Sequence, residues 1–459
     1  MKRREFLTAT MSMAGSLVPG GFSANAASPC PPPQLGVSGG GSIETSCGGT
    51  STAPDWFVNA PVGQWLEIAR HSEGKSVGAV LPNPLPTHSV DFEGPPSIAR
   101  SFGGGVVDQG RGELLLPQRG GHTQYCGNEC YALALRTSDP RWYRLCDPTP
   151  SSYIRGDNGS GNWAYNDGRM RSVHGWSRVA FANDRVWHPT LDSAFCATGD
   201  AARWTWAYHR AAAGTPVAPG GAPLAWRTGI GPFEDYGAPP ATDNGWPKGV
   251  CIHDRNSGLL WTFNGGGSPS VWTFDTRALA QGRAYFEKSG SASLVPYTAW
   301  GVHAHDLGYF FAALPIRASA YVGTDVLLFD PADPVNGWQR KTPANSFGNW
   351  MTSGGGMVSY GAAYHREARA IYCFNSADPG VIRILDLPQN PLSGTYAWRS
   401  YRPAGVVPSG ALSAVGTYGN FGIIENMGQI AGATRQALVL FRDVYGPSYV
   451  MKLPPGSLS

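Results

Sequence analysis

Residues 101–145 read SFGGGVVDQGRGELLLPQRGGHTQYCGNECYALALRTSDPRWYRL. An apolar segment follows a run of glycines, an acidic turn comes next, and two further apolar segments precede a last one that contains Trp142. Short apolar runs bounded by Gly, Pro, Asn and Asp are typical of β-strands joined by tight turns. The stretch therefore predicts a unit of four antiparallel strands.

The same pattern recurs through the rest of the chain. Further copies begin with HGWSRVAFANDRVW (174–187), KGVCIHDRNSGLLWTF (248–263), WGVHAHDLGYFFAAL (300–314), YGAAYHREARAIYCF (360–374) and YGNFGIIENMGQIAG (418–432). Their expected fourth strands read AWRTGI (225–230), AYFEKS (284–289), GWQRKT (337–342) and AWRSYR (397–402). Self-similarity of this kind is the sequence signature of a repeat architecture, in which each unit buries its faces against its neighbours.

The composition agrees with a β-rich repeat protein. The 459 residues include 61 Gly and 38 Pro, which both disfavour helix interiors, so a helical bundle is excluded. A hydrophobic fraction of 42%, with 16 Trp, 19 Tyr and 18 Phe, supplies ample apolar surface and excludes a chain that is disordered throughout. The formal charge of +3, without a basic tract, gives no electrostatic footprint for a nucleic acid.

Glycine and aromatic positions within the repeats point to a family. In the first copy a Gly120-Gly121 doublet follows the second strand, Tyr131 lies in the third and Trp142 in the fourth, and the third copy repeats the doublet at 265–267. These features resemble the kelch-type, galactose-oxidase-like β-propellers over residues 64–454, although the other four copies lack the doublet. The resemblance implies an all-β fold of six blades, with seven as the alternative. The sixth copy lacks a fourth strand, and QWLEIA (64–69) is expected to close that blade.

The amino terminus reads as an export signal. Residues 1–26 resemble a twin-arginine signal, with Arg3 and Arg4 before Phe6 and Leu7 and small residues at 24–26; an ordinary secretory signal is the alternative. We expect a Pro/Gly/Ser-rich linker over 27–60 and the propeller over 61–459. No later segment has the length of apolar sequence that a membrane span needs. The expected protein is a monomer that is periplasmic or secreted.

Eight cysteines fit an exported protein. Cys30 and Cys47 flank the linker and are expected to close a loop there. Cys126 and Cys130 have the spacing of half a zinc site, but no second pair with ligand spacing follows. A disulfide, local or involving Cys146, is therefore favoured over a metal, and its connectivity stays open.

One column of residues precedes the glycine of each first strand. First strands line the channel of a propeller, so these side chains are expected at one height around it, where aromatic rings suit a flat or sugar-like ligand. Packing between blades is the alternative role for them. The column contains Phe102, His174, Lys248, Trp300, Tyr360 and Tyr418.

A second column falls in the turn after each first strand. It contains Asp108, Asp184, Asp254, Asp306, Glu367 and Glu425. Acidic side chains stabilise turns by accepting backbone N–H groups. The neighbouring His253, His305 and His365 are accordingly expected to serve the turn and to lie away from a ligand, whereas His303 sits within a strand and could face the channel.

A third set of candidates lies in loops of the first and second copies. His122 and Tyr125 follow the glycine doublet, and Arg171 borders a polar insertion. With His174, Tyr360 or Tyr418 they could converge on one face, where a His or Tyr abstracts a proton while the arginine neutralises developing charge. That chemistry is β-elimination of a uronate polysaccharide. The alternative is that these side chains only tie down their own loops.

Two functions are consistent with this pattern. The leading one is an exported module that binds a carbohydrate or protein, with Phe102, Tyr125, Lys248, Trp300 and His303 as ligand contacts. The alternative is a uronate-glycan lyase that uses His122, His174, Tyr360, Tyr418 and Arg171. Copper oxidation is disfavoured, because no spacing singles out its ligand set, and neither a metal nor another cofactor is expected.

Overall fold

The computed structural model describes only part of the chain. The described residues are 52–89, 91, 93–100, 104–118, 120, 124–154, 164–175, 178–188, 192–194, 205–209, 233–237, 250–263, 271–276, 285–288, 300–313, 325–345, 360–376, 378–409, 417–430 and 436–458. Within them the α-helices are α1 (Asp55–Val58) and α2 (Ser97–Arg100), and the remaining helical turns are of the 3₁₀ type. The fold is all-β, as the glycine and proline content predicts.

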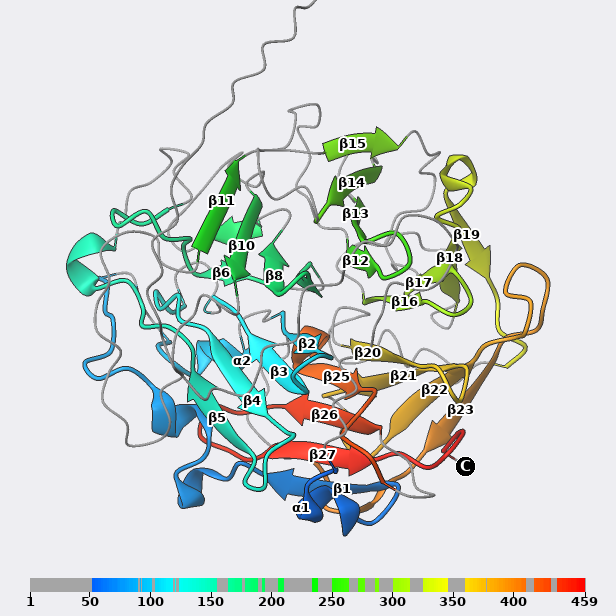
Figure 1. Ribbon diagram of the computed structural model, residues 1–459, viewed down its shortest axis with the longest axis horizontal. Coiled ribbons are helices and arrows are strands. Elements are labelled where there is room, and N and C mark those ends of the chain that lie inside the picture. Colours follow the sequence, from blue (N-terminus) through cyan, green and yellow to red (C-terminus); the bar gives the residue numbers. More distant parts are fainter. Residues whose placement is uncertain are drawn as a thin grey trace, which may run out of the picture. The chain divides into compact units, whose positions relative to one another are not determined.

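Most of the strands form six sheets, here called blades 1 to 6 (Figure 1). Blade 1 contains β2 (Val106–Asp108), β3 (Glu113–Leu116), β4 (Tyr131–Ala134) and β5 (Arg141–Arg144). Blade 2 contains β7 (Ala180–Ala182), β8 (Arg185–His188), β10 (Thr205–His209) and β11 (Phe233–Gly237). Blade 3 contains β12 (Cys251–Asp254), β13 (Leu259–Phe263), β14 (Val271–Asp275) and β15 (Tyr285–Lys288).

The last three blades continue the pattern. Blade 4 contains β16 (Gly301–Ala304), β17 (Tyr309–Ala313), β18 (Val326–Phe329) and β19 (Trp338–Lys341). Blade 5 contains β20 (Tyr360–His365), β21 (Ala370–Asn375), β22 (Ile382–Asp386) and β23 (Ala397–Tyr401). Blade 6 contains β25 (Phe421–Ile424), β26 (Ala437–Phe441), β27 (Ser448–Lys452), β1 (Gln64–Ile68) and the short β24 (Ala404–Gly405).

The first strands of the blades contact one another in sequence order. β2 contacts β7, β7 contacts β12, and the contacts continue through β16, β20 and β25 back to β2. Blades 1 to 5 are antiparallel, with the first strand innermost and the last strand outermost, and in blade 6 the innermost strand is β25. The protein is therefore a six-bladed β-propeller, and the prediction of six blades is confirmed.

Blade 6 draws strands from both ends of the described sequence. β1 pairs antiparallel with β27, with Trp65 opposite Met451 and Ile68 opposite Ser448, and its other edge pairs in parallel with β24. The Trp65 side chain is 1% exposed and packs edge-on against Phe374 of blade 5. Burial of one indole stabilises a fold by a few kcal/mol, about 25 cal/mol for each Å² of apolar surface, so this strand is held by packing as well as by its ladder.

Aromatic rings fill the space between neighbouring blades. Trp261 and Phe263 of β13 contact Phe310, Phe329 and Trp338 of blade 4, with ring centroids 4.8 to 6.3 Å apart. Most of these pairs are edge-on, which is a favourable geometry for rings in this distance range. The Trp at the start of the expected fourth strand 337–342 is thus an inter-blade packing residue.

Blade 2 departs from the expected pattern. His174 does not start an inner strand, because β6 (Val173–His174) pairs with β9 (Asp192–Ala194) in a separate two-stranded ladder, and the inner strand begins only at Ala180. The expected fourth strand 225–230 lies outside the described residues. The outer place in the sheet of blade 2 is occupied by β11, which pairs with β10 and has a β-bulge between Thr205 and Trp206. The outer strand of blade 2 is therefore the segment that hydrogen-bonds to β10, and the Trp-led sequence motif did not predict that segment.

The export signal, most of the linker and the Cys30–Cys47 loop lie outside the described residues. Within the described part, Cys126, Cys130, Cys146, Cys251 and Cys373 are buried free thiols. The expected disulfide, local to Cys126 and Cys130 or involving Cys146, is therefore not found among these residues. No helix there is both long enough and apolar enough to cross a bilayer.

Candidate functional site

The inner strands of all six blades surround a cavity of about 240 Å³. Its walls include Val107 of β2, Ala180 of β7, Ile252 of β12, Val302 of β16, Ala363 of β20 and Ile423 of β25. Trp300, which immediately precedes β16, and the rings of Phe181 and Phe421 also line it. The first strands thus line a central channel, as the propeller pattern predicts.

Polar groups gather at the end of this channel where the first strands turn into the second strands. Gln109 of blade 1, Arg255 of blade 3, His305 of blade 4 and Glu425 of blade 6 line the cavity and are partly exposed. Solvent therefore reaches the cavity at this end, which we call the hairpin-turn end.

An ion pair connects two blades across the hairpin-turn end. Arg255 Nη1 lies 2.6 Å from Glu425 Oε1, and these side chains are 20% and 25% exposed. Blades 3 and 6 are three positions apart in a ring of six, so the pair joins opposite sides of the channel. Gln109 steadies the acidic partner, because its Nε2 donates to the Ile423 carbonyl and its Oε1 accepts from the Glu425 N–H.

Two histidines next to this ion pair are neutral at physiological pH. Burial lowers the pKa of His253 to about 3, helped by the positive charge of Arg255. Burial likewise lowers the pKa of His303 to about 3, helped by His305 and Arg255. Both line the cavity, as does His305. A neutral imidazole carries one N–H donor and one acceptor nitrogen, so these rings suit a hydroxyl-bearing ligand.

The tautomer of His303 follows from its surroundings. The backbone N–H of Arg255 donates to His303 Nδ1 at 3.2 Å, so in the neutral ring the proton resides on Nε2. Nε2 lies 3.6 Å from Asp254 Oδ1, which is beyond a good hydrogen bond. His303 belongs to the wall of the cavity, so its ring faces the channel.

The acidic column stabilises the turns and also joins blades. Asp108 and Asp254 accept the backbone N–H groups of Arg111 and Asn256. Between blades, Arg111 pairs with Asp184, Asn256 Nδ2 donates to the His305 carbonyl, and Tyr364 donates to Asp306. Asp108 and Asp254 thus stabilise their turns, as expected, whereas His253 and His305, which were expected away from a ligand-binding rim, line the cavity. The turns lie at one end of the channel, so side chains next to them line the cavity.

The glycines at the opposite end have a steric role. A Cβ on Gly419 would collide with the backbone of Gly105, and one on Gly175 would collide with the backbone of Gly104. A Cβ on Gly301 would press on Ile252 and Val250. Blades 6, 1 and 2 can approach this closely only because these positions lack side chains.

The structure distributes the other predicted site residues over several environments. Of the column before the glycines, Trp300 lines the cavity, whereas the described wall includes neither His174 nor Tyr360. These two side chains are 4% and 3% exposed, and burial raises the pKa of Tyr360. Tyr418 lies in a 3₁₀ turn before β25 rather than in a strand, and nothing about its side chain is described. His122, Phe102 and Lys248 lie outside the described residues.

The loop candidates take part in local packing. Tyr125 is 1% exposed and donates to Glu129 Oε1, which also accepts from Tyr131. Arg171 is 1% exposed, its guanidinium stacks on the Tyr165 ring at 5.8 Å, and its Nε donates to the Ala164 carbonyl. These contacts agree with the alternative in which such side chains tie down their own loops.

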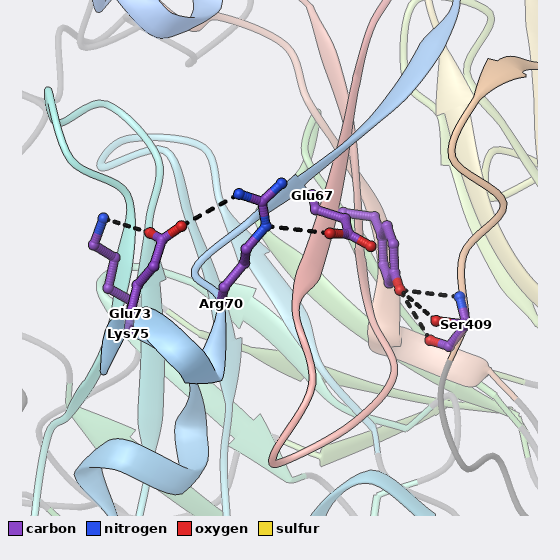
Figure 2. A network of polar contacts seen from close by, with 6 residues as sticks. Glu67, Arg70, Glu73, Lys75 and Ser409 are labelled. Carbon is purple, nitrogen blue, oxygen red and sulfur yellow. Dashed lines mark hydrogen bonds and ion pairs between the residues drawn. The ribbon is translucent and has the colours of Figure 1, made fainter.

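A separate charged cluster follows β1 (Figure 2). Arg70 pairs with Glu67 at 3.1 Å and with Glu73 at 3.3 Å, and Lys75 pairs with Glu73 at 2.7 Å. The Arg70 side chain is 49% exposed, and such surface pairs contribute little to stability. None of these residues belongs to the described wall of the cavity.

A metal centre is not evident in the part of the chain that the structure describes. No group of three or more His, Cys, Asp and Glu side chains is placed there to hold an ion.

Comparisons with known proteins give distant similarities only. No family model matches the sequence, and no curated protein matches it. A Bacteroides thetaiotaomicron protein of unknown function is 11% identical with a TM-score of 0.43, covering 84% of this chain and 75% of its own. BamB from Moraxella catarrhalis is 12% identical with a TM-score of 0.27, over 76% and 84%. A copper-bound fungal alcohol oxidase of the AA5 family is 12% identical with a TM-score of 0.35, over 77% and 62%.

Proposed function

We propose that the protein is an exported, kelch-like propeller that binds a small uncharged carbohydrate at the hairpin-turn end of its central channel. The observation that carries the proposal is a cavity of about 240 Å³ that combines aromatic rings with neutral imidazoles. Pockets for drug-sized ligands measure roughly 300–1,000 Å³, so this one suits a smaller molecule. A sugar ring offers hydroxyls to His253, His303 and His305 and a C–H face to Phe181.

The charge of the wall favours an uncharged ligand. Arg255 and Glu425 neutralise each other across the channel, and His253 and His303 carry no charge at neutral pH. A carboxylate ligand would have to compete with Glu425 for Arg255, whereas a neutral sugar leaves that pair intact. Selection of carbohydrate over protein follows from size, because a folded partner cannot enter such a cavity.

The predicted export signal supports binding of this ligand outside the cytoplasm. The Arg3-Arg4 pair and the small residues at 24–26 favour delivery to the periplasm or beyond. An exported monomer with an internal polar cavity fits a role in capturing a sugar outside the cytoplasm.

The lyase alternative has weaker support. Arg171 and Tyr125 are engaged in buried local contacts, and His174 is held in the β6–β9 ladder. Proton abstraction needs a base within reach of the substrate, together with a cation for its carboxylate. The cation at the channel, Arg255, already faces Glu425.

Titration calorimetry of the purified protein tests both functions. Neutral mono- and disaccharides are compared with uronate oligosaccharides, and the absorbance of unsaturated products is followed in parallel. We expect binding of a neutral sugar that weakens at least tenfold in His305→Ala, because that variant removes a partly exposed wall residue. His88→Ala, which alters a histidine away from the cavity, is the matched control. Binding of uronates alone, formation of unsaturated product, or equal affinity in both variants would contradict the proposal.

A further inference from the structure

The basic and the acidic side chain of the cavity wall are paired with each other. Among the described residues that line the cavity, Arg255 is the one Lys or Arg side chain and Glu425 is the one Asp or Glu side chain. Arg255 Nη1 donates to Glu425 Oε1 at 2.6 Å, across the hairpin-turn end of the channel. A ligand that enters at this end therefore meets a guanidinium that already has a carboxylate partner.

Both partners of this ion pair stand on backbone that a neighbouring blade holds in place. Gln109 of blade 1 donates through Nε2 to the Ile423 carbonyl at 2.7 Å, and its Oε1 accepts the Glu425 N–H at 2.9 Å. The Arg255 N–H donates to His303 Nδ1 of blade 4 at 3.2 Å. The two side chains thus extend from fixed positions, and the assembled ring brings them together.

We propose that Glu425 is a specificity-determining residue, which keeps acidic sugars out of the channel by occupying Arg255, and that Gln109 is the residue that positions it. This inference rests on the proposed function and adds to it a selection between neutral and acidic ligands. A guanidinium presents a planar fork of N–H donors that matches a carboxylate. Without Glu425, Arg255 would offer that fork to the carboxylate of a uronate.

The selection does not require a strong ion pair. The Arg255 and Glu425 side chains are 20% and 25% exposed, and such pairs contribute little to stability. An acidic ligand at this end must either displace the Glu425 carboxylate or lie beside it, and like charges a few ångströms apart repel each other. A neutral sugar meets neither cost. Specificity is a difference between two affinities, so a repulsive group supplies it without any new contact to the neutral ligand.

Titration calorimetry with glucose and glucuronate tests the selection, because these sugars differ only in a hydroxymethyl and a carboxylate group. We expect glucuronate to bind Glu425→Gln about tenfold or more tightly than the wild type, since Arg255 then lacks its carboxylate partner. The gain should disappear in the double variant Arg255→Gln/Glu425→Gln, and high salt should reduce it.

A matched control uses the same substitution at another ion pair. Glu67 pairs with Arg70 at 3.1 Å, its side chain is 29% exposed, and it lies outside the described cavity wall (Figure 2). Glu67→Gln therefore removes one negative charge from a pair of similar exposure, and it should bind glucuronate as the wild type does. This control separates a local effect on Arg255 from the change in net charge.

Gln109→Ala tests the positioning role. The variant releases the backbone of Glu425 but keeps both charges, so the affinity for glucuronate should rise by a smaller factor than in Glu425→Gln. If Gln109 were only structural, the variant would be less stable but would keep the wild-type ratio of glucuronate to glucose affinity. An unchanged ratio overturns the positioning role.

Two results would overturn the specificity role of Glu425. One is equal affinity for glucuronate in the wild type and in folded Glu425→Gln, and the other is a gain that survives in the double variant without Arg255. Binding of glucose to the wild type, with no gain in Glu425→Gln, contradicts the selection and leaves the proposed function standing. A gain in Glu425→Gln, when no neutral sugar binds the wild type, supports the selection and contradicts the proposed function. A fluorescence spectrum shows whether each variant has folded, and Gln109→Ala carries the test if Glu425→Gln does not fold.

Discussion

At one end of the inner strands, Gly175 and Gly419 let the backbones of neighbouring blades touch, whereas at the hairpin-turn end polar side chains bridge the blades. Close packing of the blades at the glycine end requires positions without a side chain, because an added Cβ would collide with the neighbouring backbone. The hairpin-turn end depends on many separate hydrogen bonds and ion pairs, each of modest worth. A propeller can therefore vary its ligand-facing groups at the hairpin-turn end while the glycine end keeps the ring together.

The largest loss of stability is expected when a side chain is added at the glycine end. We expect Gly419→Ala to lower the free energy of unfolding by about 3 kcal/mol, because its Cβ would collide with the Gly105 backbone, which cannot rotate away. Chemical denaturation measures the loss. Gly380→Ala, where no atom lies within 4 Å of the added Cβ, is the control and should change stability by less than about 0.5 kcal/mol. Equal effects would show that the close approach has no energetic role.

The neutral histidines make the hairpin-turn end sensitive to acid. Their folded pKa values of about 3 lie below the unfolded value of about 6.5, so the unfolded chain takes up protons first as the pH falls. Stability is therefore complete above pH ~6.5 and declines towards pH ~3, by up to about 1.4 kcal/mol per pH unit for each histidine. Denaturation between pH 7 and pH 4 should show this slope, and His303→Asn should make it shallower. An unchanged slope in the variant would contradict burial of the neutral ring.

A smaller loss of stability is expected when the acidic side chain of one turn, Asp254, is removed. Asp254→Ala removes the acceptor of the Asn256 N–H and of the Ser257 hydroxyl, and should cost about 1–2 kcal/mol in unfolding free energy. Asp254→Asn keeps a side-chain oxygen and should cost less, since the turn can still accept one N–H. If both variants lose the same amount, the charge rather than the hydrogen bond stabilises this turn.

The smallest loss of stability is expected when the Arg255–Glu425 ion pair across the channel is removed. Glu425→Gln should lower stability by about 0.2–1 kcal/mol, because both side chains of the pair are partly exposed and salt screens them. A double-mutant cycle with Arg255→Gln, repeated at high salt, measures the coupling energy. A coupling well above about 1 kcal/mol would mean that the pair holds the ring together, and that the two ends differ less than the comparison states.

Much of the architecture is readable from the repeats. The glycine column and the mostly Trp-led fourth strands favoured six blades, because several of these glycines mark a close approach between blades. The strands of blade 2 were not predicted correctly, because β6 and β9 form a separate ladder before its inner strand. Local pattern does not reveal which of two β-prone segments will pair with a given edge.

The candidate site was less accessible to sequence reasoning. Trp300 and His303 were identified, because the first directly precedes an inner strand and the second lies within it. His253, His305 and Arg255 were assigned to turns or left out, although they line the channel. A signal was available, since the third and fourth copies both place histidines beside the turn, but only the ring geometry shows that those turns face a shared cavity.

The sequence by itself determined the all-β class and favoured six blades over seven, because strand periodicity, turn residues and glycine spacing are local properties of the chain. It also marked the acidic turns, whose hydrogen bonds reach only a few residues along the chain. Only the tertiary structure decided that Arg255 meets Glu425 and that β24 pairs with the other edge of β1. These contacts join segments from different strands or blades, and their distances are set by how the sheets pack.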